Sequence, residues 1–229
     1  MKVEKISELT TNRLSIYLRC LKELSASGIA TTSSDDLAKR FHLNSAQIRK
    51  DLAYFGEFGV RGVGYYVETL REQLTNILGL NKDHRICIIG SGRMGTALAD
   101  YYEYSQTNFS VVALFDTDKS KIGQKLGNAI IYDINKFAEI VEKEGIDVAV
   151  IAVPAQFAQG ILDLVASVGI KAVMNFAPIP LKTDENIKIR TVDLTISLES
   201  LSYFLAQPLG ENGKIMKPNG KKSRLKKKK

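Results

Sequence analysis

A chain of 229 residues is long enough for two domains that each bury a core, and its 45% hydrophobic content is that of a globular protein. No stretch is apolar enough to span a bilayer, and residues 1–5 lack the apolar segment of a signal peptide. We therefore expect a cytoplasmic protein without a membrane partner. Cys20 and Cys87 stand apart in apolar runs, which predicts buried reduced thiols and no metal site.

The net charge of +7 is distributed unevenly along the chain. Residues 1–82 hold 12 Lys and Arg against 9 Asp and Glu, residues 83–210 hold 11 against 15, and residues 211–229 hold 9 against 1. The basic end is predicted to be a disordered tail. The open alternative is that it adds non-specific affinity for DNA by releasing counterions from phosphates. Because most of the charge lies there, the global value is poor evidence for DNA binding.

The N-terminal third has the pattern of a winged helix-turn-helix domain. A first helix, a helix-turn-helix block, a glycine-rich wing and a connecting helix are expected at residues 14–28, 33–55, 56–64 and 67–80. Capping oxygens at residues 32–36 precede the first helix of the block, and Asn44 offers a cap for the second.

The second helix of the block has the character of a DNA-recognition helix. Ile48 and Leu52, four residues apart, would face the core. The opposite face then offers side chains to phosphates and to base edges in a major groove: Ser45, Gln47, Arg49 and Lys50. Arg61, among the wing glycines, could reach a minor groove. The alternative that spacing alone leaves open is a solvated helix in a small helical domain.

From residue 85 the pattern changes to strands that alternate with helices. Apolar runs that predict buried parallel strands lie at residues 86–89, 111–115, 147–153 and 171–176. A helix is expected at residues 97–104 and a last amphipathic helix from Leu194 to Leu205. This alternation predicts a doubly wound α/β sheet.

The segment Gly90–Gly95 follows a predicted strand and opens a helix, as a dinucleotide-binding fingerprint requires. The first glycine permits a sharp turn, the second a close approach to a pyrophosphate, and the third close packing of helix and strand. Asp116 ends the next strand, where a carboxylate accepts from both ribose hydroxyls and repels a 2′-phosphate. NAD(H) is therefore favoured over NADP(H), although Lys119 and Lys121 lie nearby. A glycine-rich turn without a ligand is the simpler alternative.

The sequence offers no acid–base residues for hydride chemistry. His42 and His84 lie away from the expected carboxyl edge of the sheet, and the Tyr-x-x-x-Lys spacing of Tyr132 and Lys136 has no catalytic Ser upstream. We expect a domain that binds a nicotinamide without using it, and therefore no enzyme. Two other classes stay open: an NAD-dependent oxidoreductase with an accessory helical domain, and a nucleotide-gated assembly module that does not bind DNA.

From residue 14 to residue 204 the chain closely resembles the Rex family of bacterial redox-sensing transcriptional repressors. The most specific matches are residues 47–56, 61–65, 90–95, 152–154, 175–178 and 192–194. The resemblance implies a homodimer with winged-helix domains, Rossmann domains and a C-terminal helix swapped between subunits. It also implies release from a palindromic operator when NADH binds. Val60 departs from the family pattern, which has a basic or small polar residue before the wing arginine. The basic tail is an extension that the family pattern does not require.

The expected domains are residues 1–82 for the winged helix, 83–195 for the Rossmann NAD(H)-binding domain, 196–208 for the dimerisation helix and 209–229 for the tail. The expected DNA contacts are Ser45, Gln47, Arg49, Lys50, Arg61 and Gly62. The expected cofactor residues are Gly90, Ser91, Gly92, Arg93, Met94, Gly95, Asp116, Val153, Pro154, Asn175, Phe176, Ala177 and Pro178. The resemblance implies that Arg19, Tyr101 and Asp193 exchange contacts as the redox state changes.

The two redox forms of the cofactor differ by one positive charge on the nicotinamide ring. An apolar pocket formed by Val153, Pro154 and Phe176 is expected to prefer the neutral, reduced ring, because desolvating a cation is costly. Binding of NADH would then stabilise a closed dimer whose recognition helices no longer match successive major grooves, which repeat about every 34–36 Å.

Overall fold

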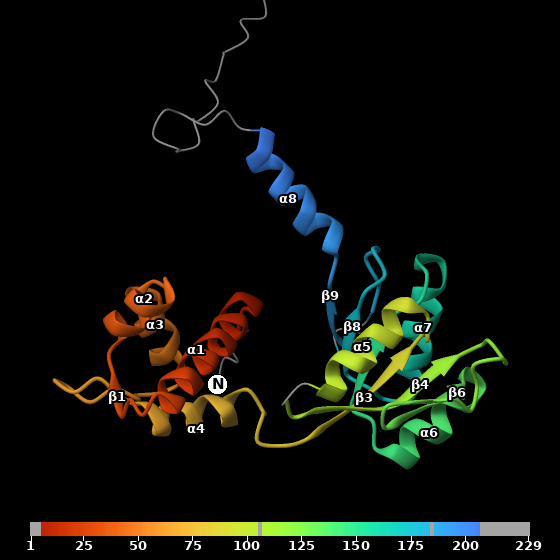
Figure 1. The fold of residues 1–229 in the computed structure, drawn as a ribbon, viewed down its shortest axis with the longest axis horizontal. Helices are drawn as coiled ribbons and strands as arrows, with labels where there is room; N and C mark the ends of the chain where they lie inside the picture. Colours follow the sequence, from red (N-terminus) through yellow and green to blue (C-terminus); the bar gives the residue numbers. More distant parts are fainter. Residues whose placement is uncertain (1–5, 105–106, 184–185, 207–229) are drawn as a thin grey trace, which may run out of the picture. The chain divides into compact units, whose positions relative to one another are not determined.

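The computed structural model describes residues 6–104, 107–183 and 186–206. The chain divides into two compact units, Met1–Asp83 and His84–Lys229 (Figure 1). The predicted tail at residues 209–229 lies outside the described residues. None of the helices in the described part of the chain combines the length and the hydropathy that a membrane span requires.

The N-terminal unit is a helical bundle with a small two-stranded sheet, which is the expected winged-helix architecture. Its elements are α1 (Glu8–Ala26), β1 (Thr31–Thr32), α2 (Ser34–Phe41), α3 (Ser45–Phe55), β2 (Tyr65–Tyr66) and α4 (Val67–Ile77). The helices converge on one apolar core in which Leu14, Leu37, Ile48 and Leu74 are at most 1% exposed. Ile48 therefore orients α3, because its side chain holds the opposite face of that helix toward solvent.

The two helices of the helix-turn-helix begin where the sequence predicts. The Ser33 hydroxyl accepts a hydrogen bond from the Asp36 N–H at 3.0 Å, and the Asp36 carboxylate accepts one from the Ser33 N–H at 3.3 Å. The Asn44 side chain accepts from the Gln47 N–H at 2.9 Å and caps α3. Between the helices His42 has a φ of 54°, so it ends α2 in the left-handed region. Local hydrogen bonds and the left-handed residue thus define where α2 begins and ends and where α3 begins.

The wing is a tight turn held by backbone hydrogen bonds. The Val60 N–H donates to the Gly64 carbonyl at 2.7 Å and the Gly64 N–H donates back to Val60 at 2.9 Å. A Cβ atom at Gly64, whose φ is +94°, would lie 2.4 Å from the carbonyl oxygen of Thr32. Glycine is therefore required where the wing crosses β1, and the turn presents Arg61 and Gly62 at its tip.

The C-terminal unit is built on a sheet in the order β5-β6-β4-β3-β7-β8-β9. The strands are β3 (His84–Ile89), β4 (Phe109–Asp116), β5 (Lys125–Leu126), β6 (Ala129–Asp133), β7 (Val148–Ile151), β8 (Ala172–Asn175) and β9 (Lys188–Thr191). Their pairings are parallel except for β5 with β6. The chain leaves β3 toward β4 and β6, then returns to the other side of β3 for β7 and β8. This reversal is the doubly wound topology that the sequence predicts, with its switch point beside β3.

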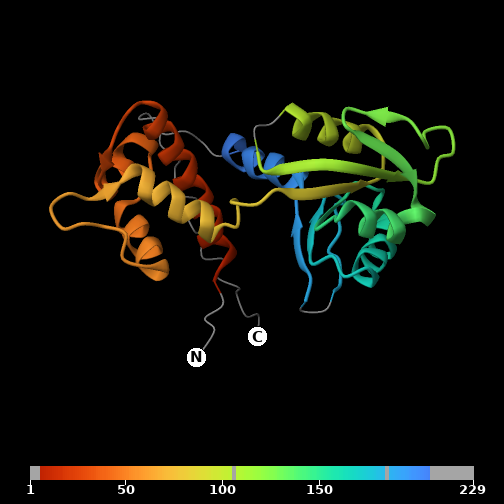
Figure 2. The same ribbon diagram turned by 90° about the horizontal axis from the view of Figure 1, so that it is seen from below.

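Helices cover both faces of this sheet (Figure 2). They are α5 (Arg93–Tyr104), the short η1 (Ile134–Lys136), α6 (Phe137–Glu144) and α7 (Ala155–Ser167). Cys87 and Ile89 point to the face that α6 and α7 cover, whereas Ile86 and Ile88 point to the face of α5. Because both faces of β3 are buried in this way, its residues form a continuous apolar run in the sequence. Cys20 and Cys87 are both buried, as expected.

The last described helix, α8 (Leu194–Ala206), has a different environment from the others. Its large apolar side chains are at least half exposed: Leu194, Ile196, Leu198, Leu201, Tyr203, Phe204 and Leu205. Exposed apolar surface of this extent marks an interaction site more often than an ordinary solvated helix.

Candidate functional site

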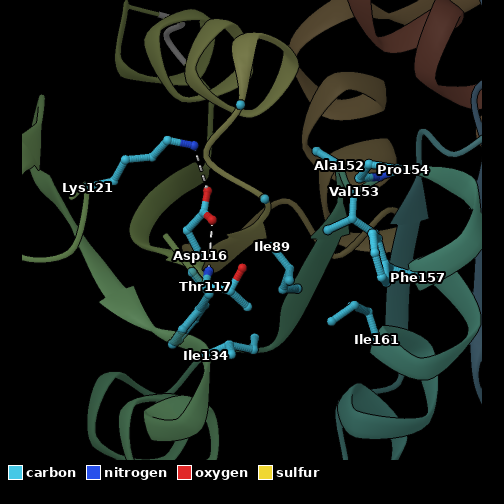
Figure 3. A pocket seen from close by; sticks show the side chains of 13 residues that line it. Ile89, Asp116, Thr117, Lys121, Ile134, Ala152, Val153, Pro154, Phe157 and Ile161 are labelled. Carbon is cyan, nitrogen blue, oxygen red and sulfur yellow. Dashed lines mark hydrogen bonds and ion pairs between the residues drawn. The ribbon is translucent and has the colours of Figure 1, made fainter. Parts of the chain in front are cut away.

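A pocket lies at the carboxyl edge of the sheet, at the switch point between β3, β4 and β7. Its cavity volume is about 370 Å³, within the range of small-molecule and cofactor sites. The pocket is lined by Ile89, Gly90, Gly92, Phe115, Asp116, Thr117, Lys121, Ile134, Ala152, Val153, Pro154, Phe157 and Ile161. Figure 3 shows a polar end around Asp116 and Lys121 and an apolar end around Val153, Pro154 and Phe157.

The glycines of the fingerprint have three different surroundings. Gly90 has a φ of +103°, and a Cβ there would lie 2.6 Å from the carbonyl oxygen of Ala152. A Cβ at Gly95 would lie 1.8 Å from the carbonyl oxygen of Gly90, so this glycine allows α5 to pack against the turn. A Cβ at Gly92 would meet nothing within 4 Å and would point into open space. The turn thus leaves room for a ligand at Gly92, where the N-terminus of α5 presents backbone amides to an anion.

The carboxylate of Asp116 is held by a dense set of donors. The backbone N–H and the hydroxyl of Ser91 donate to Oδ2 at 3.0 and 2.5 Å, and Lys121 Nζ lies 3.2 Å from the same oxygen. The N–H groups of Thr117 and Asp118 donate to Oδ1 at 2.8 and 3.0 Å. Burial alone would raise the pKa of Asp116, but the bonds from Ser91, Asp118 and Lys121 outweigh it and lower the pKa far below its ordinary value. The group is therefore an anion at every physiological pH.

The opposite end of the pocket is apolar. Val153 and Pro154 lie between β7 and α7, where Pro154 occupies the N-cap position. Phe157 and Ile161 follow on the first turns of α7 and complete this wall. Sequence reasoning missed these two residues, although their spacing of four after a predicted strand end was a usable signal. Among the described residues that line the cavity, Asp116 and Lys121 carry the titratable side chains, and both lie at the other end.

The predicted nicotinamide residues lie outside the lining of this cavity, at the end of β8 and on the turn that follows it: Asn175, Phe176, Ala177 and Pro178. Asn175 is completely buried, and its side-chain amide donates to the Ala177 carbonyl at 2.9 Å while its oxygen accepts from the Ala177 N–H at 2.9 Å. It also donates to the carbonyl of Ile179 and to the hydroxyl of Thr191. The amide therefore shapes the turn beside the pocket, and its own hydrogen bonds are internal.

The remaining predicted cofactor residues, Arg93 and Met94, open α5 with exposed side chains. Of the three predicted switch residues, Tyr101 is 66% exposed on α5 and Arg19 is exposed on α1, which belongs to the other unit. Asp193 accepts from the Thr195 N–H at 2.8 Å and so caps the start of α8. An exchange of contacts among these residues stays a prediction.

The predicted DNA contacts lie on α3 and on the wing tip. Lys50 and Arg61 are exposed, and Gly62 has a φ of +81° that shapes the tip. Arg49 is 52% exposed, but its guanidinium donates to the Ser34 hydroxyl at 2.7 Å and lies 3.4 Å from Asp35. Ser45 begins α3 and donates to Asp35, which lowers the pKa of that exposed carboxyl. Contacts within the helix-turn-helix thus restrain Arg49, whereas Lys50 and Arg61 extend into solvent.

Gln47 has a partner that the sequence did not suggest. Its amide donates to the carboxylate of Asp51 at 2.7 Å. Asp51 is only 3% exposed and also accepts from Arg13 Nε at 2.5 Å, Arg13 Nη2 at 2.8 Å and the hydroxyl of Tyr17 at 2.9 Å. We name Asp51, Arg13, Tyr17 and Gln47 the Asp51 cluster. Arg13 and Tyr17 join α1 to α3 through this carboxylate, and Gln47, which lies on α3 itself, helps to hold the carboxylate in place.

Two family models match the chain. One, described as the N-terminus of a putative DNA-binding protein, matches residues 5–53, and one described as a CoA binding domain matches residues 81–179. A redox-sensing transcriptional repressor Rex from Desulforamulus reducens is 43% identical over 90% of this chain and 98% of its own length. The Rex protein of Syntrophomonas wolfei is 46% identical over 90% and 98%.

Solved structures of a Rex-family repressor are also similar to this chain. RSP, a Rex-family repressor, has been crystallised with NAD⁺ and operator DNA, and that structure has a TM-score of 0.84 at 35% identity, covering 88% of this chain and 93% of the other. Its complex with NADH has a TM-score of 0.78 at 33% identity over 88% and 95%.

The fold and the two sites define a class of protein in which a winged helix-turn-helix unit is joined to a Rossmann-type nucleotide-binding unit. Within that class, the identities and their coverage are decisive. The chain belongs to the Rex family of redox-sensing transcriptional repressors.

Proposed function

We propose that this chain binds operator DNA as a homodimer and releases it when NADH occupies the pocket at the switch point. The observation that carries the proposal is the pocket itself: a glycine turn with open space at Gly92, an ionised carboxylate at Asp116 and an apolar opposite end, in one chain with a winged helix. The complexes of its relative RSP with NAD⁺ and operator DNA and with NADH support the same assignment.

The pocket residues fit a dinucleotide laid from Asp116 to Pro154. Asp116 would accept from the ribose hydroxyls, the amides at the start of α5 would bind the pyrophosphate, and Val153 with Phe157 would contact the nicotinamide ring. The Asn175 turn would support that ring from the adjacent strand end. Because the apolar end supplies no opposite charge, it favours the neutral reduced ring over the cationic oxidised ring.

The apolar end of the pocket also argues for a sensor without catalytic activity. Hydride transfer needs a proton donor or acceptor beside the reacting carbon. Among the described lining residues, the wall formed by Val153, Pro154, Phe157 and Ile161 carries no such group. The protein would therefore bind the nicotinamide and leave it unreacted, in the cytoplasm where DNA and the dinucleotide pool meet.

The apolar face of α8 supports the homodimer. A second copy would cover side chains such as Leu198 and Leu201, which are 66% and 59% exposed here. The changes Leu198→Glu and Leu201→Glu should each convert a dimer to a monomer in sedimentation experiments. The control Glu199→Ala on the same helix should leave the dimer intact. A wild-type protein that sediments as a monomer would contradict this part of the proposal.

The function is tested by DNA titrations with both redox forms. Duplexes enriched from a random-sequence library by the purified protein serve as the operator probe. NADH should weaken binding to the enriched duplex by about 5- to 150-fold, the usual range of allosteric coupling, and NAD⁺ should not. Equal effects of NADH and NAD⁺, or an effect of coenzyme A in place of NADH, would refute the proposal.

Two matched pairs of variants assign the sites. Asp116→Ala should abolish the NADH effect and leave DNA binding unchanged, whereas Asp118→Ala, the exposed neighbour that does not line the pocket, should retain the effect. Lys50→Ala should weaken binding to the duplex and reduce its salt slope by about one, whereas Lys22→Ala on α1 should not. A retained NADH response in Asp116→Ala would place the cofactor elsewhere.

A further inference from the structure

The polar end of the pocket contains a cation as well as the acid. Lys121 Nζ lies 3.2 Å from Oδ2 of Asp116 and 3.8 Å from Oδ2 of Asp118, and its side chain is 35% exposed. Figure 3 shows the lysine reaching across the polar end toward Asp116. The ammonium group therefore lies where we expect the ribose of the adenosine half to bind.

The carboxylate of Asp116 has no acceptor site to spare. An ionised carboxylate offers about four lone-pair sites, and Asp116 already receives the N–H and hydroxyl of Ser91, the N–H groups of Thr117 and Asp118, and Lys121. A ribose diol must replace one of these donors.

Lys121 is the donor that can be replaced at low cost. Ser91 is 4% exposed and belongs to the fixed glycine turn, and the N–H groups of Thr117 and Asp118 belong to the backbone that carries Asp116 itself. Lys121 reaches the carboxylate on a long, partly exposed stem. One rotamer change of this stem would release the carboxylate, and we expect the ammonium group to remain beside the bound ribose.

An acid at this position normally excludes NADP(H) because it repels the 2′-phosphate. Here the positive charge of Lys121 lies beside the carboxylate of Asp116 and offsets its repulsion of a 2′-phosphate. We propose that Lys121 is a specificity-determining residue of the pocket, whose ammonium group weakens the rejection of NADPH relative to NADH by contacting the ribose and its 2′ substituent. This inference rests on the proposed binding of a nicotinamide dinucleotide.

The neighbouring lysine provides a matched control. Lys119 is exposed, lies two positions before Lys121, and is not part of the pocket lining. Removing either lysine changes the net charge of the protein by the same amount. Only a local contact therefore makes the two variants differ.

The test measures dissociation constants of NADH and NADPH by the fluorescence of the reduced nicotinamide, for the wild type and for Lys121→Met, Lys121→Arg and Lys119→Met. In Lys121→Met the ratio of the NADPH constant to the NADH constant should rise by about tenfold, as expected for the loss of one unit charge close to the phosphate. Lys121→Arg should restore the wild-type ratio, and Lys119→Met should leave it unchanged. The rise should shrink at high salt.

Several outcomes would overturn the inference while leaving the proposed function intact. They are a parallel change of both constants in Lys121→Met, the same change of ratio in Lys119→Met, or no NADPH binding by the wild type at millimolar concentration. If the wild type binds neither dinucleotide, the proposed function fails first. Should Lys121→Met unfold, Lys121→Gln supplies the same measurement, and thermal melting of each variant verifies its fold.

Discussion

Removal of the Asp51 carboxylate should destabilise the N-terminal unit by about 3 kcal/mol. In Asp51→Ala the hydroxyl of Tyr17, which is 2% exposed, loses its acceptor in a place that water cannot reach, at a cost of about 1–3 kcal/mol. The loss of the charge-assisted bonds to Arg13 adds about 1 kcal/mol. We discount this part because the Arg13 side chain is 30% exposed and water can solvate it.

The assay is differential scanning calorimetry of the full chain, with circular dichroism of the helical signal. For a unit of this size, about 3 kcal/mol corresponds to a fall in melting temperature of roughly 12–24 °C in the transition of the winged-helix unit. Tyr17→Phe removes the hydroxyl together with its need for a partner and should cost less than Asp51→Ala. An exposed pair, Arg71 with Glu68 at 2.6 Å, is the control: Glu68→Ala should change the melting temperature little.

A melting temperature of Asp51→Ala within error of the wild type would refute this reasoning. It would mean that the buried carboxylate costs as much to desolvate as its hydrogen bonds return. An equal fall in Glu68→Ala would also refute it, because burial would then make no difference.

Three further predictions follow from the pocket, the cluster and the core. Gly95→Ala should unfold or strongly destabilise the Rossmann unit in a thermal melt, because its Cβ would lie 1.8 Å from the carbonyl oxygen of Gly90. Gly92→Ala should fold normally, and fluorescence titrations should show that it binds NADH at least about tenfold more weakly. Burial alone would raise the pKa of Asp51, but the bonds from Arg13 and its other partners outweigh it and lower the pKa. The contribution of Asp51 to the free energy of unfolding is therefore complete above about pH 4 and is lost as pH falls through the pKa of the folded state. Below pH 4 the free energy of unfolding should therefore fall less steeply with decreasing pH in Asp51→Ala than in the wild type. Burial raises the pKa of the Cys87 thiol to about 12, so iodoacetamide should not label it in the native protein and redox sensing should persist after the treatment; rapid labelling with loss of the NADH response would point to thiol chemistry instead.

The sequence predicted what depends on local pattern. The starts of α2 and α3 follow from Ser33 and Asn44, because each side chain caps its helix by a hydrogen bond to the backbone N–H three residues later. The glycine turn and Asp116 were predicted because the fingerprint specifies a strand, a turn and an acid at fixed spacing. These features need no knowledge of distant contacts.

What the sequence did not predict depends on contacts far apart in the chain. The position of Gln47 outside the apolar stripe of α3 predicts a DNA contact, which stays a prediction, whereas its hydrogen bond to Asp51 depends on the burial of that acid. Asp51 is buried only because Arg13 and Tyr17, more than thirty residues earlier, bring donors to it. Asn175 is expected to contact the cofactor, which stays a prediction, and its additional hydrogen bond to Thr191 could not be predicted because it depends on β9 lying beside β8.

The side chain of Asn175 also constrains how this chain can evolve. Its amide donates to the Ala177 carbonyl and to the Thr191 hydroxyl, and its backbone carbonyl accepts from Val192 at 2.8 Å, one residue before the cap of α8. A replacement at this site must supply a donor and an acceptor in the same plane. Aspartate has the shape but would oppose carbonyl oxygens with a negative charge. We therefore expect few tolerated substitutions at position 175 in a deep mutational scan, and those that fail should do so for reasons of folding even when no cofactor is present.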